Sequence, residues 1–147
     1  MKNIILIIKN MFFAFCCLLP LSACTGDDSG SKACGENVLV DAIFFENGPS
    51  MSLGITKMKI NQDCLEISFN SSGCNGDTWI VKLVDSGEVT QTTPPQRTLR
   101  LSLSSEELCE AIVEKIISFD LTSIQIQGSN QVLLKISNND SQILYEY

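Results

Sequence analysis

Apolar and polar residues alternate along much of this chain, and that pattern constrains its fold more than any other feature. The clearest run is Leu99, Leu101 and Leu103, separated by Arg100 and Ser102. Successive side chains of a β-strand point to opposite faces, so such a run predicts a strand with one buried face. Similar runs lie at 65–69, 124–127 and 132–136, and further strands are expected at 38–45, 55–60, 78–84, 116–121 and 143–147.

Turn residues separate these runs, for example Asn47-Gly48-Pro49 and Asn138-Asn139-Asp140. Many short strands with regular turns predict an all-β fold, an antiparallel β-sandwich. An immunoglobulin-like architecture fits this pattern, and Cys64, Trp79 and Cys109 resemble its cysteine, tryptophan, cysteine series. The position two before Cys109 is Glu107 instead of the usual tyrosine, so only the architecture is carried over.

One short helix is expected near residues 105–111. Ser104 and Glu107 have the spacing of a capping box, in which each side chain binds a backbone N–H of the first helical turn. Glu106 would favour the positive end of the helix dipole, and the helix would carry Cys109.

The N-terminus has the layout of a secretory signal peptide, with Lys2 and Lys9 before the apolar stretch 11–19. It ends in Leu21-Ser22-Ala23-Cys24, which resembles the lipobox of bacterial lipoproteins. That resemblance implies acyl chains such as palmitate on Cys24 and cleavage just before it. The alternatives are a transmembrane anchor, which Lys9, Asn10 and Pro20 interrupt, and a secreted protein with Cys24 in a disulfide.

The expected organisation is a signal peptide at 1–23, a flexible tether at 24–33 and one β-sandwich domain at 34–147. The tether is small and polar. Thr25 is not the aspartate that retains many lipoproteins in the inner membrane, which favours the outer membrane, and Asp27-Asp28 is similar to a surface-export signal. Both the periplasm-facing leaflet and the cell surface stay open as locations.

Charge limits the partners. Removing the signal leaves eight basic residues against 17 acidic ones, a net charge of −9. Such a surface repels phosphate backbones and anionic lipid head groups, so we expect no nucleic acid and membrane attachment only through the acyl chains.

Four cysteines remain beyond the signal and the lipid site: Cys34, Cys64, Cys74 and Cys109. An even set in an exported chain predicts two disulfides, with three connectivities. We favour Cys34–Cys64 and Cys74–Cys109. Each disulfide would close a loop and stabilise the folded state by about 3 to 4 kcal/mol in the chain-entropy account. The wide spacing and the absence of histidine argue against a zinc site.

Catalysis has little support in the sequence. Without histidine, the usual Ser-His-Asp and Cys-His nucleophiles are excluded. Asp77, Asp85 and Glu88 are candidates for the paired carboxylates of a glycan hydrolase, but loop acids in a Gly, Ser and Thr-rich region are expected to be solvated. Neither a metal nor an organic cofactor is expected.

Residues 85–98 form the longest stretch without periodicity, and long loops on a stiff scaffold often recognise partners. The other interpretation is a crossover between the two sheets. The candidate partner-binding residues of this loop are Gln91, Pro94, Pro95, Gln96 and Arg97.

These features predict a lipid-anchored envelope protein that is a non-catalytic binding or structural accessory and not an enzyme. Its partner would be an envelope or extracellular protein or a glycan. The alternative function is an inhibitor of an extracellular enzyme that acts through the 85–98 loop, and a more remote one is the carboxylate-dependent glycan hydrolase.

Overall fold

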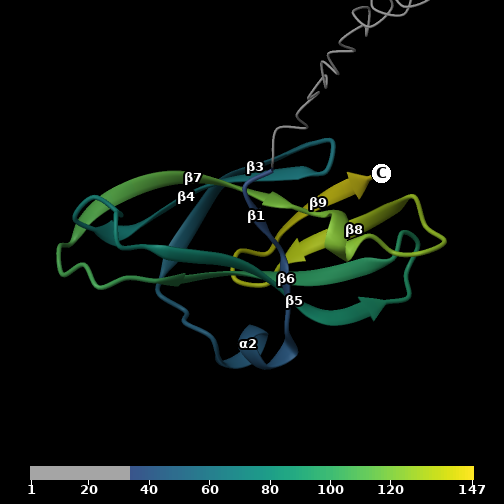
Figure 1. Ribbon diagram of the computed structural model, residues 1–147, viewed down its shortest axis with the longest axis horizontal. Helices are drawn as coiled ribbons and strands as arrows, with labels where there is room; N and C mark the ends of the chain where they lie inside the picture. The colour runs from purple at the N-terminus through teal and green to yellow at the C-terminus, as the bar shows by residue number, and fades with distance from the viewer. Residues whose placement is uncertain (1–33) are drawn as a thin grey trace, which may run out of the picture. The chain divides into compact units, whose positions relative to one another are not determined.

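The computed structural model describes residues 34–147, which form two β-sheets packed together, so the expected all-β sandwich is confirmed (Figure 1). The predicted signal peptide, Cys24 and the tether lie outside the described residues. The elements are β1 (Glu36–Asn37), β2 (Leu39–Val40), α2 (Ala42–Asn47), β3 (Leu53–Asn61), β4 (Cys64–Gly73), β5 (Ile80–Thr90), β6 (Gln96–Ser104), β7 (Ala111–Asp120), the 3-10 helix η1 (Thr122–Ile124), β8 (Gln131–Ile136) and β9 (Ser141–Glu146).

The two sheets are mixed and not purely antiparallel. The first has the strand order β1-β7-β4-β3 and the second has the order β2-β5-β6-β8-β9. Three neighbouring pairs are parallel, namely β1 with β7, β2 with β5 and β6 with β8. The antiparallel expectation is therefore wrong for these pairs, because the chain crosses from one sheet to the other between them instead of forming hairpins within one sheet.

The core follows most of the alternation that the sequence shows. The strand expected at 124–127 is wrong, because Thr122–Ile124 form η1, which buries Ile124, and residues 125–127 belong to no strand. In β4, Leu65, Ile67 and Phe69 are buried, and in β6 Leu99, Leu101 and Leu103 are buried. Their polar neighbours point away from the core, as the period of two requires. Trp79 lies at the margin of this core, where its ring is 5.8 Å from that of Phe69.

The segment from β1 to α2 changes sheets and then turns into a helix. β1 pairs with β7 in the first sheet, β2 pairs with β5 in the second, and buried Val38 lies between them. The strand expected over 38–45 is wrong beyond Val40, because the Asp41 carboxylate accepts the backbone N–H of Phe44 at 2.8 Å and caps α2. Among the described residues, no helix is long and apolar enough to cross a membrane.

The helix expected near 105–111 is also wrong. Residues 105–110 form an irregular connection between β6 and β7, and Ser104 is the last residue of β6. The carboxylate of Glu107 does not reach back to the backbone N–H of Ser104. It accepts hydrogen bonds from a loop 31 to 33 residues earlier in the chain, so a long-range contact replaces the local capping box.

Candidate functional site

The first described residue is fixed covalently to the domain. Cys34 and Cys64 form a disulfide with their Cα atoms 5.4 Å apart, and Cys64 is the first residue of β4. This pair is one of the two favoured from the sequence. It attaches the start of the domain to a central strand of the first sheet, at the point where the predicted tether would end.

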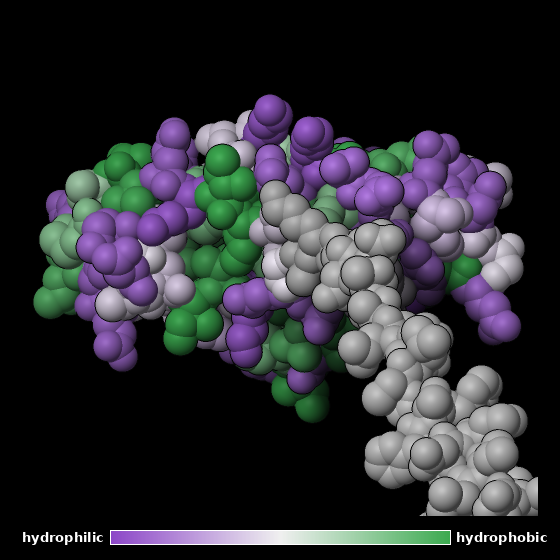
Figure 2. Space-filling view, turned by 45° about the horizontal axis from the view of Figure 1, so that its top comes forward, coloured by the Kyte–Doolittle hydropathy of each residue, from purple (hydrophilic) through white to green (hydrophobic). Residues whose placement is uncertain are grey.

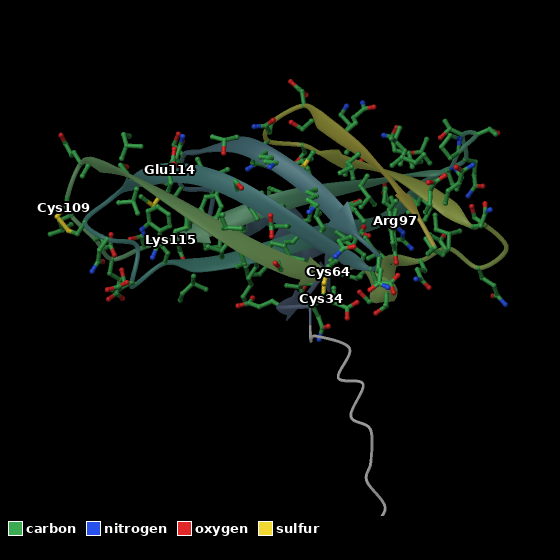
Figure 3. All side chains as sticks on the ribbon, turned by 90° about the horizontal axis from the view of Figure 1, so that it is seen from above. Cys34, Cys64, Arg97, Cys109, Glu114 and Lys115 are labelled. Carbon is green, nitrogen blue, oxygen red and sulfur yellow. A yellow bond between two sulfur atoms is a disulfide. The ribbon has the colours of Figure 1, made fainter. Side chains whose placement is uncertain are left out.

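The second disulfide joins two loops at another part of the domain. Cys74 follows β4 and Cys109 precedes β7, and their Cα atoms are 4.8 Å apart. Figure 3 shows Cys109 far from both Cys34 and Cys64, so the two disulfides brace separate regions. Neither disulfide pairs Cys64 with Cys109, so the immunoglobulin-like cysteine pattern does not hold.

Glu107 reinforces the second disulfide. One of its carboxylate oxygens, Oε2, accepts the backbone N–H groups of Cys74 at 2.6 Å, Gly76 at 3.1 Å and Asn75 at 3.2 Å. Burial alone would raise the pKa of Glu107, but the hydrogen bonds from the backbone N–H groups outweigh that effect and lower its pKa from 4.5 to about 2. The anionic carboxylate therefore holds the 74–78 loop against the 105–110 connection.

The 85–98 stretch is neither a long loop nor a crossover between sheets. Strands β5 and β6 extend into it from both sides and pair with each other in one sheet, leaving only residues 91–95 as the hairpin turn. A register shift between Asp85 and Val89 marks a bulge, which explains the lost periodicity.

The candidate partner-binding residues divide into exposed and structural ones. Gln91 is exposed in the turn, and Pro94 and Pro95 are half-buried. The carbonyl of Pro95 accepts the backbone N–H of Leu133 from β8 at 2.9 Å, and Gln96 begins β6. Only the tip of the hairpin is therefore free to contact a partner.

Arg97 is committed to an ion pair inside the sheet. Its Nη1 donates to Oδ2 of Asp85 at 2.9 Å, with the Asp85 side chain 0% exposed and the Arg97 side chain 13% exposed. The other oxygen of Asp85 accepts the backbone N–H of Gly87 at 2.7 Å. Arg97 compensates a buried charge and exposes little of its side chain, and its contact with a partner stays a prediction.

The candidate acids lie in different environments. Asp77 precedes β5 and its side chain is 73% exposed, near the amine of Lys115 at 3.8 Å. Asp85 is paired with Arg97, and Glu88 is exposed within the bulge. Within residues 34–147, no group of three His, Cys, Asp or Glu side chains could hold a metal ion.

Sequence reasoning missed two features of this domain. It assigned Glu107 to a helix cap, and it began the strand at 116 where β7 begins at Ala111. The signal for the longer strand is present, because Ile112, Val113, Ile116 and Ile117 place apolar residues on both faces of an extended segment. That pattern lacks simple alternation, so it does not resemble a half-buried strand.

Comparisons with known proteins identify the fold and no family. No protein-family model matches the chain, and no curated protein matches it. One similar solved structure is a protein of unknown function, DUF1344, from Bacteroides vulgatus, with TM-score 0.54, 15% identity and coverage of 78% of this chain and 57% of that one. Another is a NigD-like immunity protein from Bacteroides caccae, with TM-score 0.53, 10% identity and coverage of 76% of this chain and 58% of that one. The chain thus matches less than two thirds of the length of either protein.

Proposed function

We propose that this protein is a lipid-anchored protein of the outer membrane whose folded domain is a non-catalytic binding or structural accessory. The observation that carries the proposal is the placement of Cys34, which begins the described domain ten residues after the lipobox cysteine Cys24 and is joined to Cys64. A chain held by acyl chains at Cys24 would present a domain that is firmly attached from its first residues.

The two disulfides support an extracytoplasmic location, since such bonds persist in oxidising compartments. The acyl chains would contribute about 0.8 kcal/mol for each buried methylene, so two or three chains would hold the protein on a membrane. One solved protein of similar fold is described as an immunity protein, and an immunity role would be one form of the binding proposed here.

The other functions fit the structure less well. An inhibitor that presents Arg97 would need that side chain free, and it is paired with buried Asp85. A glycan hydrolase would need two carboxylates on either side of a substrate, but the Asp85 carboxylate is buried in its ion pair with Arg97 and the Asp77 side chain is exposed before β5.

Acylation at Cys24 tests the proposed anchor. Cells expressing the wild-type chain or Cys24→Ser would be grown with a fatty-acid analogue and then fractionated into inner and outer membranes. We expect label on the wild type, in the outer-membrane fraction, and none on Cys24→Ser. Equal labelling of both chains would refute the lipid anchor, and wild-type label in the inner membrane would refute the assigned location.

A further inference from the structure

Strand β7 has an open edge along most of its length. On one side it pairs with β4 over all ten of its residues, but on the other β1 covers only Phe119 and Asp120. Gly35 has a left-handed φ of 52°, so the backbone changes direction immediately before β1 begins. Residues 111–118 of β7 therefore have no neighbouring strand among the described residues on this side.

The backbone groups at this edge can be assigned from the ladder. The carbonyl of Asp120 accepts the N–H of Val38 at 3.4 Å, so it points toward the β1 side. Alternate residues of an antiparallel strand direct both backbone groups to the same side. The N–H and C=O groups of Ile112, Glu114 and Ile116 consequently point to the open edge, and none has a backbone partner there within residues 34–147.

The side chains beside this edge are apolar and acidic. Ile112 and Ile116 are 72% and 68% exposed, and exposed Glu114 lies between them on the outer face of the sheet. The inward side of the same strand differs, since Lys115 faces the Asp77 side chain. Figure 2 shows hydrophobic patches interrupted by hydrophilic side chains on the side where β7 runs, and Figure 3 shows Glu114 at the same end as Cys109.

The other long edge of this sheet is protected and β7 is not. Exposed Lys57 and Lys59 lie on β3, which also has a register irregularity between Ile55 and Lys57. Charged side chains and bulges of this kind prevent strand addition. The outer face of β7 has two isoleucines and a single acid in the equivalent stretch, and Lys115 lies on the other face beside Asp77, so this edge can accept another strand.

Charge identifies the occupant. Residues 34–147 contain seven basic and 15 acidic residues, and exposed Glu106 and Glu110 lie just before β7. A second copy that placed each Ile112 opposite Ile116 would place Glu114 opposite itself, and like charges directly opposite destabilise a pair of strands. A different, cationic chain avoids this repulsion.

We propose that the β7 edge binds an extended cationic peptide segment by strand addition, with apolar residues opposite Ile112 and Ile116 and a lysine or arginine opposite Glu114. The backbone of the segment would pair with the free N–H and C=O groups, and its alternate side chains would form the cross-strand pairs. The pattern that this edge selects is apolar, any residue, basic, any residue, apolar. This inference specifies the partner class for the proposed binding function.

The test uses the processed protein in detergent and a fluorescent peptide, acetyl-Thr-Ile-Thr-Lys-Thr-Ile-Thr-amide, with anisotropy as the readout. A matched peptide has glutamate in place of lysine. We expect the lysine peptide to bind and the glutamate peptide to bind about tenfold more weakly, because a like charge replaces an opposite one beside Glu114. Amide hydrogen exchange should show new protection within β7.

Two variants of Glu114 separate charge from backbone pairing. Glu114→Lys should weaken binding of the lysine peptide about tenfold and favour the glutamate peptide. Glu114→Pro removes an N–H that points away from β4, so it should abolish binding and preserve the β4–β7 ladder. Glu146→Lys makes the same charge change at an exposed residue of β9 and should leave binding unchanged. If the proline variant unfolds, Ile112→Thr with Ile116→Thr tests the same edge.

The proposal is overturned if the lysine peptide does not bind, if Glu114→Lys binds it as well as the wild type, or if protection appears on β3 or β9. It is also overturned if sedimentation shows a dimer that Glu114→Pro dissociates, because the edge then binds a second copy. The Cys24 labelling experiment is independent of all these outcomes. If the peptide does not bind but Cys24 is labelled, the proposed partner is rejected and the lipid anchor stands. If the peptide binds but Cys24 is not labelled, the anchor is rejected and the partner stands.

Discussion

A single residue, Glu107, links the 74–78 loop to the 105–110 connection. Its carboxylate accepts backbone N–H groups from the 74–78 loop, and its pKa of about 2 lies below the ordinary 4.5. A carboxylate whose pKa is lowered by folding stabilises the folded state at pH values above the pKa that it has in the unfolded chain. That contribution is lost as the pH falls from about 4.5 toward 2.

We predict that Glu107→Gln makes the acid sensitivity smaller. The wild-type melting temperature should fall more steeply between pH 5 and pH 2 than that of the variant, and at pH 7 the variant should melt roughly 2 to 5 °C lower. Calorimetry over this pH range would measure both effects. Glu106→Gln is the matched control, because Glu106 is exposed on the neighbouring position. Parallel pH profiles for wild type and Glu107→Gln would contradict the assigned role.

Arg97 makes a second prediction at this scale. Arg97→Met would leave Asp85 buried without its cationic partner, and removing one member of a buried pair costs about 3 to 5 kcal/mol. The double variant Asp85→Leu with Arg97→Met removes both charges and should recover much of that loss. Urea unfolding measures both free energies. A single variant as stable as the wild type would show that the ion pair is energetically unimportant.

The strands and their connections determine which segments tolerate change. The β5–β6 hairpin has its turn at 91–95, whereas Arg97 belongs to the paired part of β6. We predict that replacing residues 91–95 with a Gly-Ser turn of equal length retains the fold, with a loss below about 1 to 2 kcal/mol. Extending the replacement through Arg97 should destabilise the domain as strongly as Arg97→Met. Equal effects of the two replacements, measured by urea unfolding, would show that the turn itself is packed.

The loop disulfide is a separate brace. Removing it with Cys74→Ala and Cys109→Ala frees a segment with a sequence separation of 35 residues, and the expected loss is about 3 to 4 kcal/mol. Thermal unfolding with and without Glu107→Gln would show whether the two links act together. If they do, the loss of the combined variant should be smaller than the sum of the separate losses, because removing either link already loosens the two loops that the other link holds.

The sequence predicts those strands in which apolar and polar residues simply alternate between a buried and an exposed face. Residues 65–69 and 99–103 are examples, since one face of each is simply buried. The errors share a physical cause, which is that distant residues decide the local structure. In the sequence alone, Asp85 and Arg97 look like residues of a polar loop, but in the structure they pair with each other. Ser104 and Glu107 have the spacing of a helix cap, but Glu107 instead binds the 74–78 loop. The parallel pairs and the open edge of β7 depend on sheet order, which the alternation does not encode.

The whole molecule provides a test of the covalent framework. If all four cysteines of the described domain are paired as the structure has them, denatured and unreduced protein should contain no free thiol from this domain. Thiol titration of the processed chain measures this, with acylated Cys24 contributing no thiol. Two or four reactive groups would contradict the framework, and peptide mapping would identify which disulfide is missing.

The Cys34–Cys64 disulfide also determines how the domain would carry mechanical load. A pulling force applied to the chain before Cys34 passes directly through the disulfide into β4, a central strand of its sheet. The 29 residues between the two cysteines, which include β1, β2, α2 and β3, are bypassed by that path. The two-residue strands β1 and β2 would otherwise be peeled away first. With the bond intact, the force instead acts on a strand held by hydrogen bonds on both sides.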